Sequence, residues 1–160
     1  MAAITAHGMS ADPPRGWDAV IYRRPPQAHG VVGRALNAPP ETPLPILHLG
    51  NFALPPERGD YGGNVVTAMR TGGVFVSILQ HDQADAGTAL FADRPPPWPL
   101  APDDLHPNAL PRRFDGGAGH QAFFLAAGRP YCLFVVIAGY PQRVRLVGLA
   151  NDALATVTFS

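Results

Sequence analysis

The sequence predicts an α+β domain, in which an antiparallel β-sheet of about five to seven strands carries a C-terminal amphipathic helix on one face and Pro-rich loops elsewhere. Three observations predict this class. The 160 residues include 19 prolines and 17 glycines, which favour short elements over long helices. The runs 74–81 and 131–138 are β-rich and apolar on both faces, as interior strands are. Apolar residues recur at near-helical spacing over 142–154.

The N-terminal part of the chain predicts a tail followed by short strands. Residues 1–16 are small and polar, without periodicity, so we expect a poorly ordered tail and one globular domain over 17–160. Strands are expected at 17–22 and 46–54. Between them, the Pro-rich stretch 23–45 permits only brief extended pieces such as 31–36.

Two hairpins are expected in the centre of the chain. The runs 64–70 and 74–81 flank Gly72 and Gly73, a pair able to adopt the positive φ of a tight turn. A helical turn over 65–70 is the alternative. The second hairpin joins 121–126 to 131–138, and further short strands are expected at 87–92 and 155–159.

The charge balance argues against several classes of partner. Twelve basic and twelve acidic residues give a net charge of zero, so no global field attracts nucleic acid or anionic lipid. No apolar run approaches the ~20 residues needed to cross a bilayer. We also expect no secretory leader, and we expect a cytoplasmic protein that binds neither nucleic acid nor membranes.

The sequence offers no strong catalytic or cofactor motif. None of the serines lies in a Gly-x-Ser-x-Gly elbow. The glycine clusters lack the strand-to-helix context of a phosphate loop, and we expect no cofactor. Cys132, the single cysteine, lies in the most apolar strand, where burial raises the pKa of a thiol; His120 is the nearest candidate partner.

Two clusters carry the candidate functional residues. His81, Asp82 and Asp85 place an imidazole and two carboxylates within five residues, with His106 as a further ligand from the following loop. Such groups suit a divalent metal, although a solvated turn has the same composition. A small metal-assisted enzyme is therefore the alternative function.

The second cluster lies in the Pro-rich segment 94–111. Arg94, Trp98 and Leu100 lie in or beside a run of prolines that favours a stiff polyproline II conformation, which docks at little entropic cost. Trp98 either meets a partner or folds back to cover the sheet. The leading hypothesis is a non-catalytic binding or accessory module that contacts a protein partner or a small apolar ligand through the Pro-rich loops; a homodimer is a further option.

The C-terminal half also carries a resemblance. The runs 127–139 and 149–157, with shorter stretches at 47–49, 59–63 and 107–110, resemble small actinobacterial proteins without an assigned activity, over about residue 17 to the end. The strand, helix, strand ending is similar in topology to PsbP-like and Mog1-like α+β domains. That likeness implies a binding or accessory role and assigns no functional residue.

Overall fold

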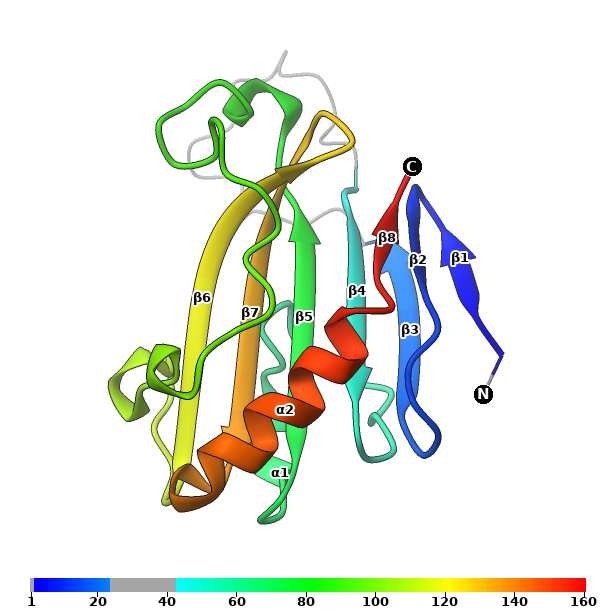
Figure 1. Ribbon diagram of the computed structural model, residues 1–160. Helices are drawn as coiled ribbons and strands as arrows, with labels where there is room; N and C mark the ends of the chain where they lie inside the picture. Colours follow the sequence, from blue (N-terminus) through cyan, green and yellow to red (C-terminus); the bar gives the residue numbers. More distant parts are fainter. Residues whose placement is uncertain (1, 24–42) are drawn as a thin grey trace, which may run out of the picture.

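A five-stranded antiparallel sheet in the order β3-β4-β5-β7-β6 forms the centre of the molecule (Figure 1). The computed structural model describes residues 2–23 and 43–160. The strands are β3 (Asp18–Arg23), β4 (Pro45–Gly50), β5 (Val74–Gln80), β6 (Gly117–Ala126) and β7 (Arg129–Ala138). The predicted fold class is confirmed, since the sheet carries the C-terminal helix α2 (Arg143–Leu154).

A second sheet corrects the prediction of a disordered tail. Residues 4–11 form the hairpin of β1 (Ile4–Ala6) and β2 (Met9–Ala11), and β2 pairs with the closing strand β8 (Thr158–Phe159). Met9 and Ala11 are buried against the same core as α2. The composition of this stretch hid its structure, because its partner strand lies at the other end of the chain. The expected piece at 31–36 lies outside the described residues.

The first predicted hairpin is wrong in its first arm. Residues 64–68 form the short helix α1 (Asn64–Ala68), which was the alternative interpretation. Both sides of β5 are already paired, one with β4 and the other with β7, so no ladder position is left for a strand at 64–70. Helical geometry instead buries Val65 and Val66 side by side against the sheet.

The strand expected at 87–92 is also absent: these residues form consecutive turns that bury Phe91. The strand expected at 46–54 ends at Gly50, and the one at 17–22 is β3. The second predicted hairpin is confirmed as β6 and β7. Short 3-10 helices complete the connections, at Gln83–Asp85, Pro102–Asp104, Pro107–Ala109 and Tyr140–Gln142.

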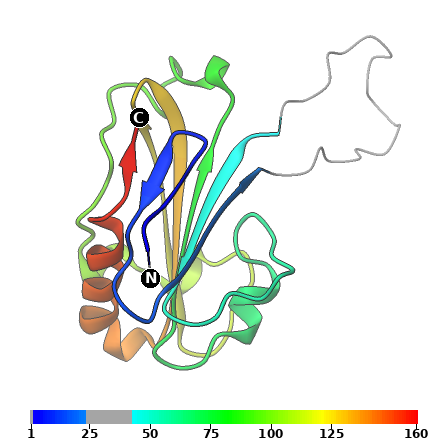
Figure 2. The same ribbon diagram turned by 90° about the vertical axis from the view of Figure 1, so that its right-hand side faces the viewer.

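The sheet has a different cover on each face (Figure 2). One face packs against α2 and the small sheet and holds the larger core, with Leu133, Val135 and Ile137 of β7 fully buried. The opposite face packs Phe75, Phe134 and Val136 against α1 and the loops that flank it. Within residues 2–23 and 43–160, no helix has the length and apolarity that crossing a membrane demands.

Candidate ligand pocket

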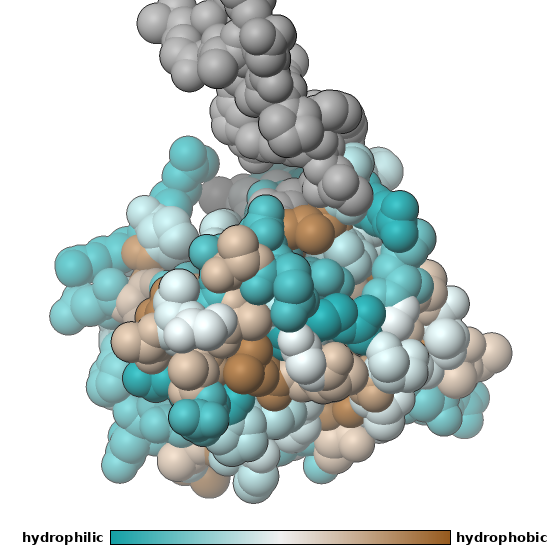
Figure 3. Space-filling view, turned by 90° about the horizontal axis from the view of Figure 1, so that it is seen from above, coloured by the Kyte–Doolittle hydropathy of each residue, from teal (hydrophilic) through white to brown (hydrophobic). Residues whose placement is uncertain are grey.

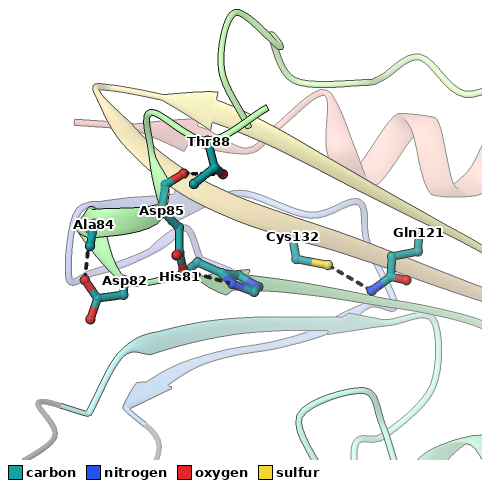
Figure 4. A network of polar contacts seen from close by, with 7 residues as sticks. All are labelled: His81, Asp82, Ala84, Asp85, Thr88, Gln121 and Cys132. Carbon is teal, nitrogen blue, oxygen red and sulfur yellow. Dashed lines mark hydrogen bonds and ion pairs between the residues drawn. The ribbon is translucent and has the colours of Figure 1, made fainter. Parts of the chain in front are cut away.

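The three candidate metal ligands that follow β5 lie in one small turn (Figure 4). His81 Nδ1 is 4.0 Å from a carboxylate oxygen of Asp85, and the His81 ring packs against Phe91 at a centroid distance of 5.1 Å. The Asp82 carboxylate accepts a hydrogen bond of 2.9 Å from the Ala84 amide. Asp82 therefore caps the 3-10 turn at Gln83–Asp85, as such residues do at helix starts.

The structure does not bring the fourth candidate ligand to this turn. His106 pairs with Gly119 near the start of β6, whereas the His81 amide bonds to Pro130, which faces Leu125 near the end of β6. The two contacts are separated by roughly 20 Å of strand at ~3.3 Å per residue. Among the residues that the structure describes, no three His, Cys, Asp or Glu side chains are grouped to hold a metal ion.

Cys132 is a fully buried side chain of β7. Burial raises the pKa of its thiol, and a hydrogen bond of 3.4 Å from the Gln121 side-chain amide to Sγ opposes that shift only in part (Figure 4). The protonated, enclosed thiol is a poor nucleophile, in agreement with the sequence-based expectation.

We expect Cys132 to react with an aromatic disulfide reagent at least about a hundredfold more slowly in the native protein than in urea, because the thiol is both buried and protonated. Stopped-flow absorbance at neutral pH measures both rates. Native labelling at the rate of the unfolded chain would contradict the burial of this residue.

The candidate binding residues of the Pro-rich segment, Arg94, Trp98 and Leu100, belong to a loop that covers the sheet. The Trp98 ring packs edge-on against Phe124 at 5.4 Å and stacks on Phe159 at 6.2 Å, and Leu100 is buried. Arg94 is exposed, and its carbonyl accepts the Leu125 amide at the edge of β6. Trp98 thus folds back onto the domain.

The side chain of Asn151 in α2 fastens this cover. Its Oδ1 accepts from the Leu100 amide at 2.7 Å, and its Nδ2 donates to the Leu100 carbonyl at 2.9 Å. We expect Asn151→Ala to lower the free energy of unfolding by about 2 kcal/mol, since both backbone groups lose their partner. Asp152→Ala, at an exposed neighbouring position, should change it by less than about 0.5 kcal/mol. Urea unfolding followed by circular dichroism measures the stability of both variants. An equal loss of stability in the two variants would contradict the role of the Asn151 hydrogen bonds.

Figure 3 shows the upper end of the molecule, where the described residues differ in hydropathy from one to the next. Viewed from above, hydrophobic residues form small separate patches between polar ones (Figure 3).

A pocket of about 410 Å³ lies on the sheet face opposite α2. The Gly-rich loop 59–63, here called the Gly loop, forms one wall together with the start of α1. The end of the Pro-rich segment and the following arginine form the other wall, through Leu110, Pro111 and Arg112. Phe134 of β7 also lines the pocket and is only 2% exposed. This volume falls in the range of small-ligand sites.

The lining of the pocket is apolar close to the sheet and polar at the rim. Val66 and Leu110 are buried beside Phe134. Tyr61 stands edge-on to Phe134 at a centroid distance of 5.4 Å and is 37% exposed. Asn64 and Arg112 are exposed. We call this site the Gly-loop pocket.

Buried polar side chains hold the Gly loop on the sheet. The carbonyl oxygen of Asp60 accepts hydrogen bonds from Ser77 Oγ at 2.6 Å and from His48 Nε2 at 3.2 Å. Arg58 Nε donates to His48 Nδ1 at 3.2 Å, which places the imidazole proton on Nε2. Ser77 and His48 are opposite each other on β5 and β4 and are both fully buried. The wall of the pocket is thereby fixed before any ligand arrives.

Burial and Arg58 keep His48 uncharged. Withdrawal from water lowers the pKa of His48 to about 4, the hydrogen bond to the Asp60 carbonyl opposes this shift, and the nearby Arg58 charge adds to it. The His48 and Ser77 side chains therefore act as fasteners, since both already donate to one carbonyl. Ser77 has no free hydroxyl hydrogen for a nucleophilic role in this arrangement.

This pocket was not predicted, because the glycines at 59–63 lack the strand-to-helix context that marks a phosphate-binding loop. The available signal was His48 on a predicted strand, followed within about a dozen residues by Arg58 and Asp60, which can form hydrogen bonds with a buried histidine. The Pro-rich segment, which forms part of the second wall, was predicted to bind a ligand or partner. The residues of this region that line the pocket include Leu110 and Arg112, and Trp98 is not among them.

Comparison of the chain with protein-family models, curated proteins and solved structures found no match.

Proposed function

We propose that the protein is a non-catalytic binding module that holds a small, largely apolar ligand in the Gly-loop pocket. The observation that carries the proposal is the pocket itself: about 410 Å³, buried aromatic and aliphatic residues in its lining, and polar groups at its rim. The expected binding role is retained, and its place moves from Trp98 to the end of the Pro-rich segment. A cytoplasmic location remains part of the proposal.

The fixed wall supports a binding role over a catalytic one. The buried polar side chains that hold the Gly loop already have partners: His48 and Ser77 both donate to the Asp60 carbonyl, and Arg58 donates to His48. A preformed site of this kind binds without an ordering cost in the loop, which is how rigid pockets gain affinity. Neither His48 nor Ser77 could act as a general base or a nucleophile without leaving this network first.

Thermal-shift screening of the full chain against a library of small aromatic and aliphatic compounds tests the proposal. A ligand present at a hundred times its Kd stabilises by about 2.7 kcal/mol, which is about 5 to 10 °C for a domain of this size. Two variants locate the site. Asn64→Trp fills the mouth of the pocket from an exposed position, and Trp98→Ala alters the cover on the opposite face.

The expected hits stabilise the natural protein and Trp98→Ala and lose their effect in Asn64→Trp. Hits that survive Asn64→Trp and disappear in Trp98→Ala would overturn the proposal and return the site to the Pro-rich run. A library without any hit would overturn it as well.

A further inference from the structure

The charged groups of the Gly-loop pocket stand on opposite walls. Asp60 belongs to the Gly loop, and Arg112 follows the Pro-rich segment. The guanidinium of Arg112 forms no hydrogen bond or ion pair with any residue in 2–23 or 43–160. An exposed cation beside an apolar cavity is a natural partner for a ligand anion, since water screens it less once the ligand is bound.

On this basis we infer that the ligand is a small monocarboxylate, with an aromatic or aliphatic body against Phe134 and its carboxylate on Arg112. The inference rests on the proposed binding function and specifies its ligand class. Arginine offers two parallel N–H groups that match the two oxygens of a carboxylate. The apolar body is accommodated by Val66 and Leu110, whose side chains are buried in the lining.

The Gly loop sets the orientation of the ligand. A ligand that turned its carboxylate toward the Gly loop would meet Asp60, whose position is fixed through its carbonyl by His48 and Ser77. Residues 59–63 include no basic side chain to receive a carboxylate, so the Arg112 end is the favourable one.

Three probes with one shared body test the assignment: 3-phenylpropanoate, 3-phenylpropanamide and 3-phenylpropylamine. We expect isothermal titration of the full chain at low salt to rank the acid at least about tenfold tighter than the amide, with the amine weakest. Arg112→Gln should weaken the acid about tenfold and leave the amide unchanged. Arg113→Gln is the matched control, because Arg113 is an exposed neighbour outside the pocket lining.

The possible failures of the two proposals differ. If the three probes bound with equal affinity and Asn64→Trp abolished this binding, the carboxylate assignment would be wrong. The proposal that the pocket binds a small ligand would still be supported. A loss in Arg113→Gln equal to that in Arg112→Gln would also overturn it, as would a lack of binding by all three probes at millimolar concentration. The broader library screen decides the pocket independently.

Discussion

Replacing Gly62 with alanine is expected to destabilise the domain by about 3 kcal/mol, through backbone strain and overpacking together. Gly62 has φ +95°, a conformation that side chains disfavour. A Cβ at this position would lie 2.8 Å from a ring carbon of Phe75 and 2.9 Å from a methyl of Val66. Both neighbours are buried in the second core, so neither can move aside cheaply.

Gly59→Ala is the matched control within the same loop. Gly59 is exposed, is not among the glycines with positive φ, and would place a Cβ at an ordinary 3.5 Å from Gly63. We expect this change to alter the free energy of unfolding by less than about 0.5 kcal/mol. Chemical denaturation of both variants supplies the comparison. If the two alanines cost the same, the Gly loop does not pack on Phe75 as described.

Acid is expected to remove about 3 kcal/mol of stability through His48 alone. Because burial lowers its pKa from 6.5 to about 4, the unfolded chain takes up a proton at a higher pH than the folded one. The contribution of His48 is therefore complete above about pH 6.5 and is lost as the pH falls toward 4, by the linkage between proton uptake and unfolding.

Glutamine at this position isolates the effect. His48→Gln keeps one acceptor for Arg58 and one donor for the Asp60 carbonyl but does not titrate. We expect the stability of the natural protein, measured by urea unfolding at intervals from pH 7 to pH 4, to fall by about 3 kcal/mol more than that of the variant. Parallel pH profiles would mean that His48 is not held neutral by burial.

The parts of the fold that follow local patterns could be predicted. Apolar runs on either side of a glycine turn predict the hairpin of β6 and β7, and helical spacing of apolar residues predicts α2. Each of these patterns lies within a short stretch of the chain. Each of these elements takes the conformation that its own residues favour, and tertiary packing agrees with it.

The errors arose where a distant segment decided the structure. Residues 64–70 favour a strand by composition, but β4 and β7 occupy both edges of β5, and the segment forms α1 instead. The hairpin of β1 and β2 exists because β8 pairs with it from the far end of the chain. Neither the pairing of β5 with β4 and β7 nor the pairing of β2 with β8 can be predicted from a short stretch of sequence.

The pocket could not be predicted either, because its walls come from segments that are far apart in the chain. Tyr61 and Arg112 are about fifty residues apart, and each belongs to a stretch that looks like an ordinary turn. Only the sheet, which brings Phe134 between the two walls, turns them into a cavity. By contrast, the cover formed by Trp98 was foreseen as one of two interpretations, because a tryptophan among prolines is either presented or folded back.

Chemical-shift mapping is the most direct test of the Gly-loop pocket. Two-dimensional amide spectra of the labelled protein, recorded with the strongest hit of the library screen, should show the largest shifts at Tyr61, Asn64 and Arg112, with Trp98 and His81 unchanged. Shifts centred on Trp98 or on His81, with no change in the amide signals of the Gly loop, would contradict ligand binding in the Gly-loop pocket.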